Sequence, residues 1–166
     1  AKKSSGRRTA LEMLTRCHQR LDGVMPELAA ALANGDDEIV DESLAFLNGS
    51  LLRHFVDEEE SVFPLLSRSA YGPLIDRLMT EHRSHAGTIE ALTSAWRRGD
   101  RRAATSLAAE LATALEHHSQ LEESILWPAI GNLDVATLEL ARSEMRARRP
   151  GGGRGLGRRR RARGRS

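Results

Sequence analysis

Two segments of this sequence, 54–64 and 118–128, place a histidine four residues before a pair of glutamates. On a helix, residues four apart lie on the same face, so an imidazole nitrogen and a carboxylate oxygen can bind one cation together. A single such pair is usually an ordinary surface contact. Two copies, each followed by an aromatic residue and a proline, indicate a shared role. The two pairs are His54 with Glu58 and His118 with Glu122.

The two segments belong to a longer duplication in which the second half of the chain repeats the first with an offset of 64 residues. Under this offset His82 corresponds to His18, and the Gly-Asp dipeptide at 99–100 corresponds to the one at 35–36. A unit of this length that occurs only twice predicts a helical hairpin, doubled. The expected fold is therefore all-α: an up-down-up-down four-helix bundle with internal two-fold symmetry.

Apolar residues recur at spacings of three and four, which predicts four long helices and a short fifth helix. Aromatic residues make up only 4% of the chain, and Leu and Ala dominate its apolar set, which suits helix-on-helix packing. On the fourth helix we expect Leu111, Leu115 and Ile125 to point inward. The expected helices cover about residues 9–33, 37–66, 73–98, 101–130 and 134–148, and the expected domain is 9–148.

Each long helix places one histidine on its inward face, and the second and fourth helices add a glutamate. Buried imidazoles and carboxylates are costly unless they bind a partner, and a bundle can hold a metal pair between facing helices. One core histidine alone would more often be an ordinary hydrogen-bonded residue. His85 is a further candidate ligand on the third helix, although its counterpart under the offset is Leu21. The predicted metal ligands are His18, His54, Glu58, His82, His118 and Glu122.

The predicted donors are nitrogen and oxygen atoms. The single cysteine, Cys17, excludes both an intramolecular disulfide and a cysteine-based zinc site. Six donors shared by two ions leave coordination positions open, which favours iron, with manganese or zinc as alternatives. We expect Cys17 to be a small packing residue. We expect Glu81 at most to contact a metal ligand without binding the metal itself. Glu59, Glu60 and Glu123 are expected to form a solvated acidic rim.

The four histidines and the two His-x-x-x-Glu motifs resemble the hemerythrin-like HHE cation-binding family over about residues 10–148. The resemblance implies a non-haem di-iron centre in which Glu58 and Glu122 bridge the irons and the histidines cap them. It also implies that dioxygen, nitric oxide or peroxide binds at the open positions. Oxygen-carrying hemerythrins have a second histidine four residues after the third-helix histidine. Ala86 stands there, which favours sensing, redox or iron-handling roles over oxygen transport.

Charge is divided unevenly along the chain. Residues 146–166 contain ten of the 25 basic residues and no acid, which leaves 15 basic against 23 acidic residues in the rest, a formal charge of −8. We expect the Arg/Gly-rich tail, 149–166, to be disordered. Such a tail can bind nucleic acid without sequence preference, or it can be a merely solvated extension.

Three functions therefore stand at this point. The first is a di-iron protein that binds or senses a small gas or peroxide. The second is an enzyme that reduces peroxide or dioxygen, or a protein that donates iron in repair, for which the sequence supplies no electron-donor site. The third is a nucleic-acid-associated protein that acts through its tail.

Hydropathy and cysteine usage bear on where the protein works. No stretch approaches the 18 apolar residues that a membrane span needs, and no uncharged apolar run follows the basic N-terminus. A single cysteine fits a reducing compartment. We therefore expect a soluble cytoplasmic protein.

Overall fold

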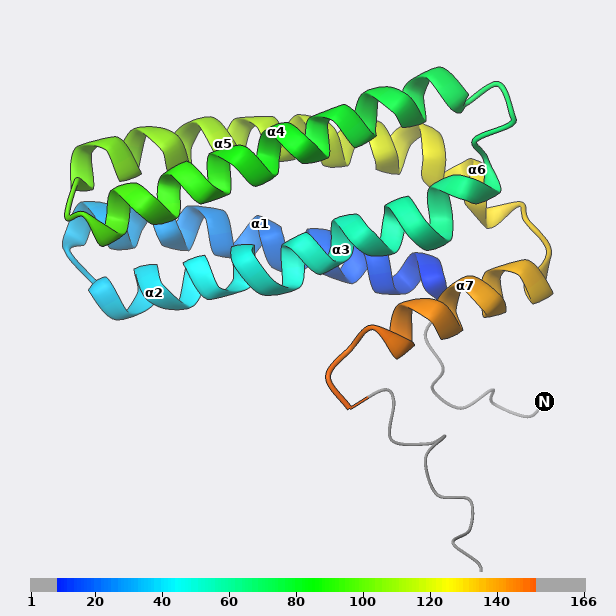
Figure 1. Cartoon of the computed structure of the whole chain (residues 1–166), viewed down its shortest axis with the longest axis horizontal. Coiled ribbons are helices and arrows are strands. Elements are labelled where there is room, and N and C mark those ends of the chain that lie inside the picture. The colour runs from blue at the N-terminus through cyan, green and yellow to red at the C-terminus, as the bar shows by residue number, and fades with distance from the viewer. Residues whose placement is uncertain (1–8, 152–166) are drawn as a thin grey trace, which may run out of the picture.

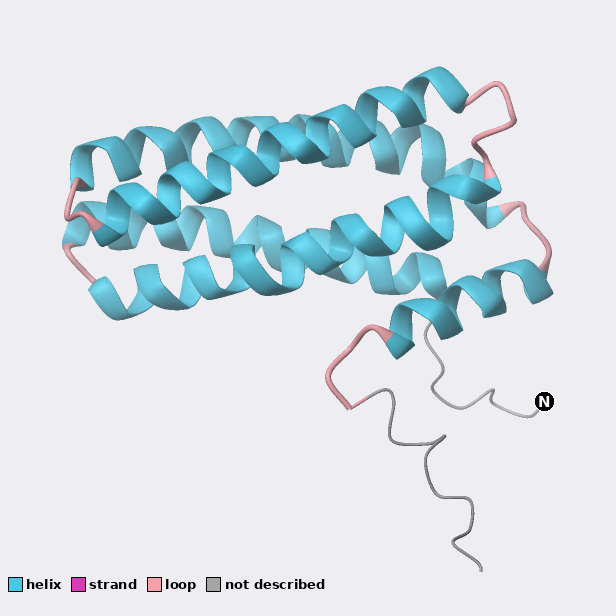
Figure 2. Cartoon of the chain, in the orientation of Figure 1, coloured by secondary structure: helices cyan, strands magenta, loops and turns pink. Residues whose placement is uncertain are grey.

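Helices account for nearly all of residues 9–151, the part of the chain that the computed structural model describes (Figure 1, Figure 2). The described part contains no strand, so the all-α prediction is confirmed. Disorder is predicted for the tail, 149–166, and the residues from 152 onward lie outside the part of the chain that the structure describes. The elements are α1 (Ala10–Asn34), α2 (Asp37–Phe46), η1 (Leu47–Leu51), α3 (Leu52–Asp57), η2 (Glu58–Val62), η3 (Phe63–Leu65), α4 (Gly72–Arg97), α5 (Arg101–Leu121), η4 (Glu122–Leu126), α6 (Trp127–Gly131) and α7 (Val135–Ala147).

The second and fourth long helices are each built from consecutive short elements. Residues 37–65 run without a break from α2 to η3, and residues 101–131 run from α5 to α6. With α1 and α4 they form the four-helix bundle, in which α1 contacts α2 and α5, and α4 contacts α5. No helix within residues 9–151 is both long enough and apolar enough to cross a lipid bilayer.

The two hairpin turns are built in the same way. Gly35 and Gly99 end the first and third helices with φ angles of 76° and 75°, a left-handed conformation that favours glycine. The next residue caps the following helix: Asp36 accepts the Ile39 N–H, and Asp100 accepts the Ala103 N–H. The 64-residue duplication thus extends to the turns that make each hairpin.

Helix α7 lies against one end of the bundle, where it contacts α1 and η2 (Figure 1). Ala141 and Met145 are its buried apolar residues. Beyond its end, Arg148 and Arg149 both form ion pairs with the fully buried Asp57 at 3.0 Å. Asp57 lies between the candidate ligands His54 and Glu58 in sequence, so these ion pairs tie the end of the described chain to the helix that carries them.

The core is divided into two apolar clusters. One is built from leucines such as Leu28, Leu47 and Leu92, and lies toward the hairpin turns. The other includes Leu14 and Phe63, together with buried residues of α6 and α7. The candidate metal ligands lie at the middle of the bundle, at positions between these clusters, so apolar side chains shield them from both ends.

The second and fourth helices each contain a π-helical turn that begins at a candidate glutamate, Glu58–Val62 and Glu122–Leu126. A π turn adds a residue to one helical turn, so the side chains that follow it are rotated relative to an α-helix. For this reason Leu126 is buried while Ile125 is 40% exposed, and the predicted inward position of Ile125 is wrong. Such turns are frequent at functional sites.

Candidate metal centre

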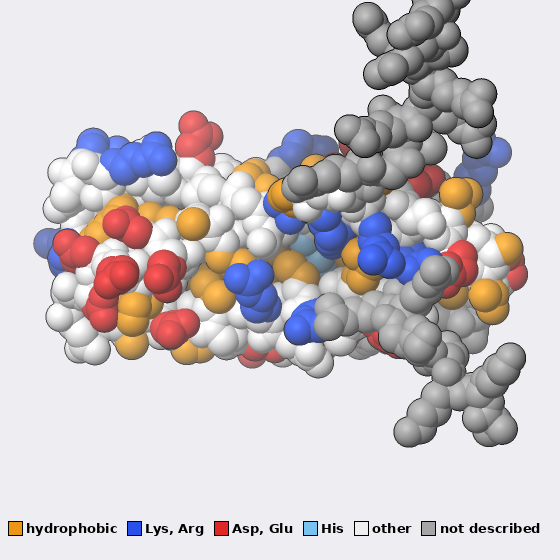
Figure 3. Space-filling model, turned by 90° about the horizontal axis from the view of Figure 1, so that it is seen from below, with side chains coloured by type: hydrophobic (Ala, Val, Ile, Leu, Met, Phe, Trp, Pro, Cys, Tyr) orange, Lys and Arg blue, Asp and Glu red, His pale blue; other side chains and the backbone are white. Residues whose placement is uncertain are grey.

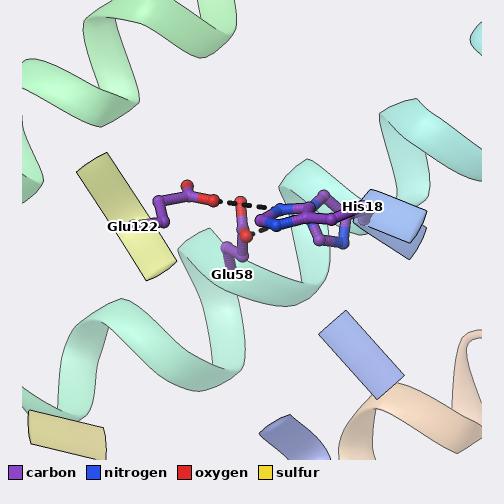
Figure 4. A group of neighbouring side chains, drawn as sticks. His18, Glu58 and Glu122 are labelled. Carbon is purple, nitrogen blue, oxygen red and sulfur yellow. Dashed lines mark hydrogen bonds and ion pairs between the residues drawn. The ribbon is translucent and has the colours of Figure 1, made fainter. Parts of the chain in front are cut away.

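Six buried histidine and glutamate side chains converge in the middle of the bundle, each at most 4% exposed. Figure 4 shows His18 with the carboxylates of Glu58 and Glu122 directed toward it. All four long helices contribute one histidine, and the two π turns contribute the glutamates. They form two groups whose ligand atoms lie within 4.8 Å of one another: His18, His54, Glu58 and Glu122, and Glu58, His82, His118 and Glu122.

The first group joins the first and second long helices to both glutamates. The Nε2 atoms of His18 and His54 lie 3.1 Å apart. His54 Nε2 lies 2.9 Å from Glu58 Oε1, and His18 Nε2 lies 3.1 Å from Glu122 Oε2. One oxygen of each carboxylate therefore faces this pair of imidazoles.

The second group repeats this arrangement with the other carboxylate oxygens. The Nε2 atoms of His82 and His118 lie 3.0 Å apart. His82 Nε2 lies 3.1 Å from Glu58 Oε2, and His118 Nε2 lies 2.8 Å from Glu122 Oε1. Each glutamate thus presents one oxygen to each group, which is the geometry of a carboxylate that bridges two cations.

The outer nitrogens of three of these rings indicate which atom faces the centre. At 2.8 Å each, His18 Nδ1 lies against Glu123, and His82 Nδ1 against Glu59. His118 Nδ1 lies against Glu81 at the same distance. A neutral imidazole that donates from Nδ1 carries its lone pair on Nε2. The Nε2 lone pairs of these three rings therefore point inward, and those of His82 and His118 face each other.

Lone pairs that face each other need a metal cation or a proton between them. The carboxylate oxygens of Glu58 and Glu122 lie close to the ring nitrogens, yet none of the four has a hydrogen-bond partner. Two ligand atoms that each lie about 2.1 Å from an ion and at right angles are about 3.0 Å apart. The observed separations fit one ion in each group, with Glu58 and Glu122 shared.

A family model described as the Hemerythrin HHE cation binding domain matches residues 9–130. This range is most of the chain and contains all six side chains. The chain belongs to this family. Neither the curated proteins nor the solved structures contain a match to it. The two buried groups are suited to be the cation site of the HHE domain.

Glu59 and Glu123 have a different role in the HHE domain from the one expected. They do not form a free acidic rim, because each accepts a hydrogen bond from the Nδ1 of a candidate ligand. Glu60 is exposed and pairs with Arg148 instead. Glu81 acts behind a candidate ligand, as expected. The duplication contains a signal for the role of Glu59 and Glu123, because both glutamates of each Glu-Glu pair repeat and not only the candidate ligand.

The outer contact of His54 differs from that of its counterpart in the second half. Glu81 accepts a hydrogen bond from His118, whereas the residue that corresponds to Glu81 in the first half is Cys17. Burial would lower the pKa of His54, but Glu58 and, after it, the adjacent Cys17 raise that pKa well above its usual value. The two candidate metal groups of the HHE domain therefore have the same inward-facing donor atoms but different residues around the outer side of the imidazoles.

The charges inside the site oppose the effect of burial. Burial alone would lower the pKa of His82, but the neighbouring carboxylates of Glu122 and Glu58 raise it to about 10. Burial would raise the pKa of Glu122, yet the surrounding imidazoles of His118, His18 and His82 hold that pKa well below the usual range. Protons and cations therefore compete for the same atoms of the HHE domain.

His85 is buried beside the second group without belonging to it, but it forms a third possible cation-binding group with Glu81 and His118, whose ligand atoms lie within 4.8 Å of one another. Its ring meets that of His118 edge-on at 5.0 Å, and its Nε2 has no hydrogen-bond partner. Burial and the neighbouring imidazoles of His118 and His82 lower the pKa of His85 to about 4, so this side chain is neutral near pH 7. The second group therefore has an unpartnered imidazole nitrogen nearby, where the first half of the chain has Leu21.

Aromatic side chains cover the histidines of both groups. Trp127 stacks on His18 with ring centroids 5.4 Å apart, and Phe63 stacks on His82 at 5.7 Å. These two aromatic residues correspond under the 64-residue offset, and both are buried. They keep water from the inner edge of the imidazoles, which strengthens electrostatic interactions at the site.

Proposed function

We propose that this hemerythrin HHE domain holds two iron ions and reversibly binds or senses dioxygen, nitric oxide or peroxide. The main observation in support of this proposal is the direction in which the carboxylate oxygens of the two glutamates point. Glu58 and Glu122 each direct one oxygen to the His18 group and one to the His82 group. In the proposed site both glutamates bridge the ions, His18 and His54 hold one ion, and His82 and His118 hold the other.

The donor chemistry supports iron. Each group offers two imidazole nitrogens and two carboxylate oxygens, and an octahedral ion would keep further positions for an external ligand. Manganese or zinc would accept the same atoms. When bound, two irons supply open coordination positions and a redox couple suited to small gases and peroxide. His85 Nε2, which has no hydrogen-bond partner, is a further polar atom beside the second group.

The metal content tests this proposal directly. Protein from iron-supplemented expression should hold about two metal ions per chain, chiefly iron, because the six side chains offer four donor atoms to each of two groups. Elemental analysis, with absorption spectra recorded anaerobically and in air, measures this. One zinc ion per chain, with no near-ultraviolet charge-transfer band in air, would contradict it.

A catalytic role is the second candidate, and the unpartnered His85 nitrogen is the observation that favours it, since such an atom can exchange a proton with a bound peroxide. The first proposal expects iron-loaded protein to bind peroxide or nitric oxide without sustained consumption. Continuous peroxide consumption by the purified protein, lost in His85→Leu, would favour the enzymatic function.

We also propose that the protein is cytoplasmic, because a single cysteine fits a reducing compartment.

The arginine-rich tail gives a separate prediction. Ten arginines in residues 146–166, with no acid among them, can neutralise several phosphates and release counterions. The full chain should therefore bind DNA without sequence preference, with an affinity that falls steeply as salt rises. Deleting residues 150–166 should abolish binding in an electrophoretic shift assay and leave the metal content unchanged. Equal DNA binding by the shortened chain would show that the tail has no such role.

A further inference from the structure

A cavity of about 230 Å³ opens beside the first metal group, on the outer side of His54. Helix α1 contributes Arg16, Cys17 and Arg20 to its wall, α3 contributes Arg53 and His54, and Arg149 lines it from beyond the end of α7. Four guanidinium groups and no carboxylate line this arginine pocket. Figure 3 shows blue basic side chains grouped around a histidine on the face formed by α1, α3 and α7.

The positive charge of the arginine pocket is poorly neutralised by the protein. Among the described residues, Arg16, Arg20 and Arg53 form no ion pair, and Arg149 alone is paired, with Asp57. Arg20 is held over the ring of Phe46 at 4.8 Å, which orders its side chain without neutralising it. Like charges gathered in a concave wall repel one another and concentrate a positive field, so an anion in the pocket relieves both effects.

The duplication shows that the bundle does not require these arginines. The residues that correspond to Arg16, Arg20 and Arg53 are Thr80, Ser84 and His117. On that side Glu81 takes the place of Cys17, and it pairs with Arg77 at 2.9 Å and with His118. The same fold, with the same inner histidines, is therefore built in the second half without a basic cluster.

We propose that the arginine pocket is a binding site for a small oxyanion of the phosphate class, seated against the outer side of His54. The volume is below the roughly 300–1,000 Å³ of clefts that hold drug-sized ligands, so the pocket admits a phosphate group rather than a large molecule. Guanidinium groups bind tetrahedral oxyanions through paired, charge-assisted hydrogen bonds. The site is independent of the metal, and it places an anion directly against His54, a member of the first candidate metal group.

Two measurements on the full chain test the arginine pocket. Cys17 is the only cysteine and lines the pocket, so inorganic phosphate at constant ionic strength should slow its alkylation by neutral iodoacetamide at least threefold. Titration calorimetry should give saturable phosphate binding, and Arg16→Gln/Arg53→Gln should weaken it roughly tenfold or more. A phosphate monoester that binds more tightly than inorganic phosphate would identify a phosphate group of a larger molecule as the ligand.

A matched control removes the same charge elsewhere. Arg98→Gln/Arg102→Gln lies at the hairpin end of the bundle and should leave phosphate affinity within twofold of the unchanged protein. Both double variants keep the arginine-rich tail, so any phosphate bound by the tail is equal in the two. Equal weakening in both double variants, or alkylation of Cys17 that phosphate does not slow, would overturn the proposal. The alkylation result needs no variant, so it decides the question even if Arg16→Gln/Arg53→Gln fails to fold.

Discussion

Removing the metal ions should lower the melting temperature of this hemerythrin HHE domain by about 10 °C. The six converging side chains are nearly inaccessible to water. Without a metal ion, the carboxylate oxygens of Glu58 and Glu122 have no hydrogen-bond partner. A metal ion present at roughly 1,000 times its dissociation constant stabilises the native state by about 4 kcal/mol. In a domain of this size each kcal/mol shifts the melting temperature by about 2–4 °C.

Thermal unfolding followed by circular dichroism, before and after treatment with a chelator, measures the effect. Glu58→Gln/Glu122→Gln is the matched control, because it retains the shape of both bridging side chains and removes their charge. This variant should melt at the same temperature with and without chelator. An unchanged melting temperature for the original protein after complete metal loss would mean that the metal lies outside the buried site.

Much of this architecture could be predicted because the duplication constrains it twice. The positions of His18 and His82 on their helices follow from spacing alone, and each supports the interpretation of the other. The turns at Gly35 and Gly99 follow from a Gly-Asp dipeptide at a helix end, where a left-handed residue and a cap are both needed. These features depend on local chemistry, which a sequence displays directly.

The π turns could not be predicted in the same way. Helical periodicity assumes about 100° per residue throughout, and on that assumption Glu59 and Glu123 lie off the inward face. The extra residue in each turn changes the direction of the side chains that follow, and a histidine from another helix supplies the partner. Both depend on tertiary packing, which local propensity does not contain. The same change of direction explains why Ile125 is exposed, although helical periodicity predicts an inward position.

The arginine pocket illustrates the opposite case, in which departures from the duplication are informative. Arg16, Arg20 and Arg53 are unremarkable as single exposed or half-buried arginines. Only the fold brings them to one cavity, and only comparison with the second half shows that this charge is not needed to build the bundle. Internal symmetry therefore separates what the fold requires from what one half has added.

The sharpest test of the ligand set compares two neighbours on α4, His82 and His85. His82 faces both bridging glutamates, at 3.1 Å from Glu58 and 3.9 Å from Glu122, and its outer nitrogen is held by Glu59. His82→Ala removes one of four ligands from the second group and leaves buried carboxylate oxygens without a partner. We expect this variant to lose at least one of two metal ions per chain by elemental analysis.

His85→Leu should keep both ions, because His85 belongs to neither four-residue group and leucine already stands at the corresponding position, Leu21. The change removes a buried nitrogen that has no partner, which is worth about 1–3 kcal/mol, so stability should be equal or higher. The rate of reaction with nitric oxide or peroxide, followed by stopped-flow absorption, should change several-fold if His85 contacts the bound ligand. Equal metal loss in His82→Ala and His85→Leu would instead make His85 a fifth histidine ligand, and would bring the second group close to the pattern of the oxygen-carrying hemerythrins.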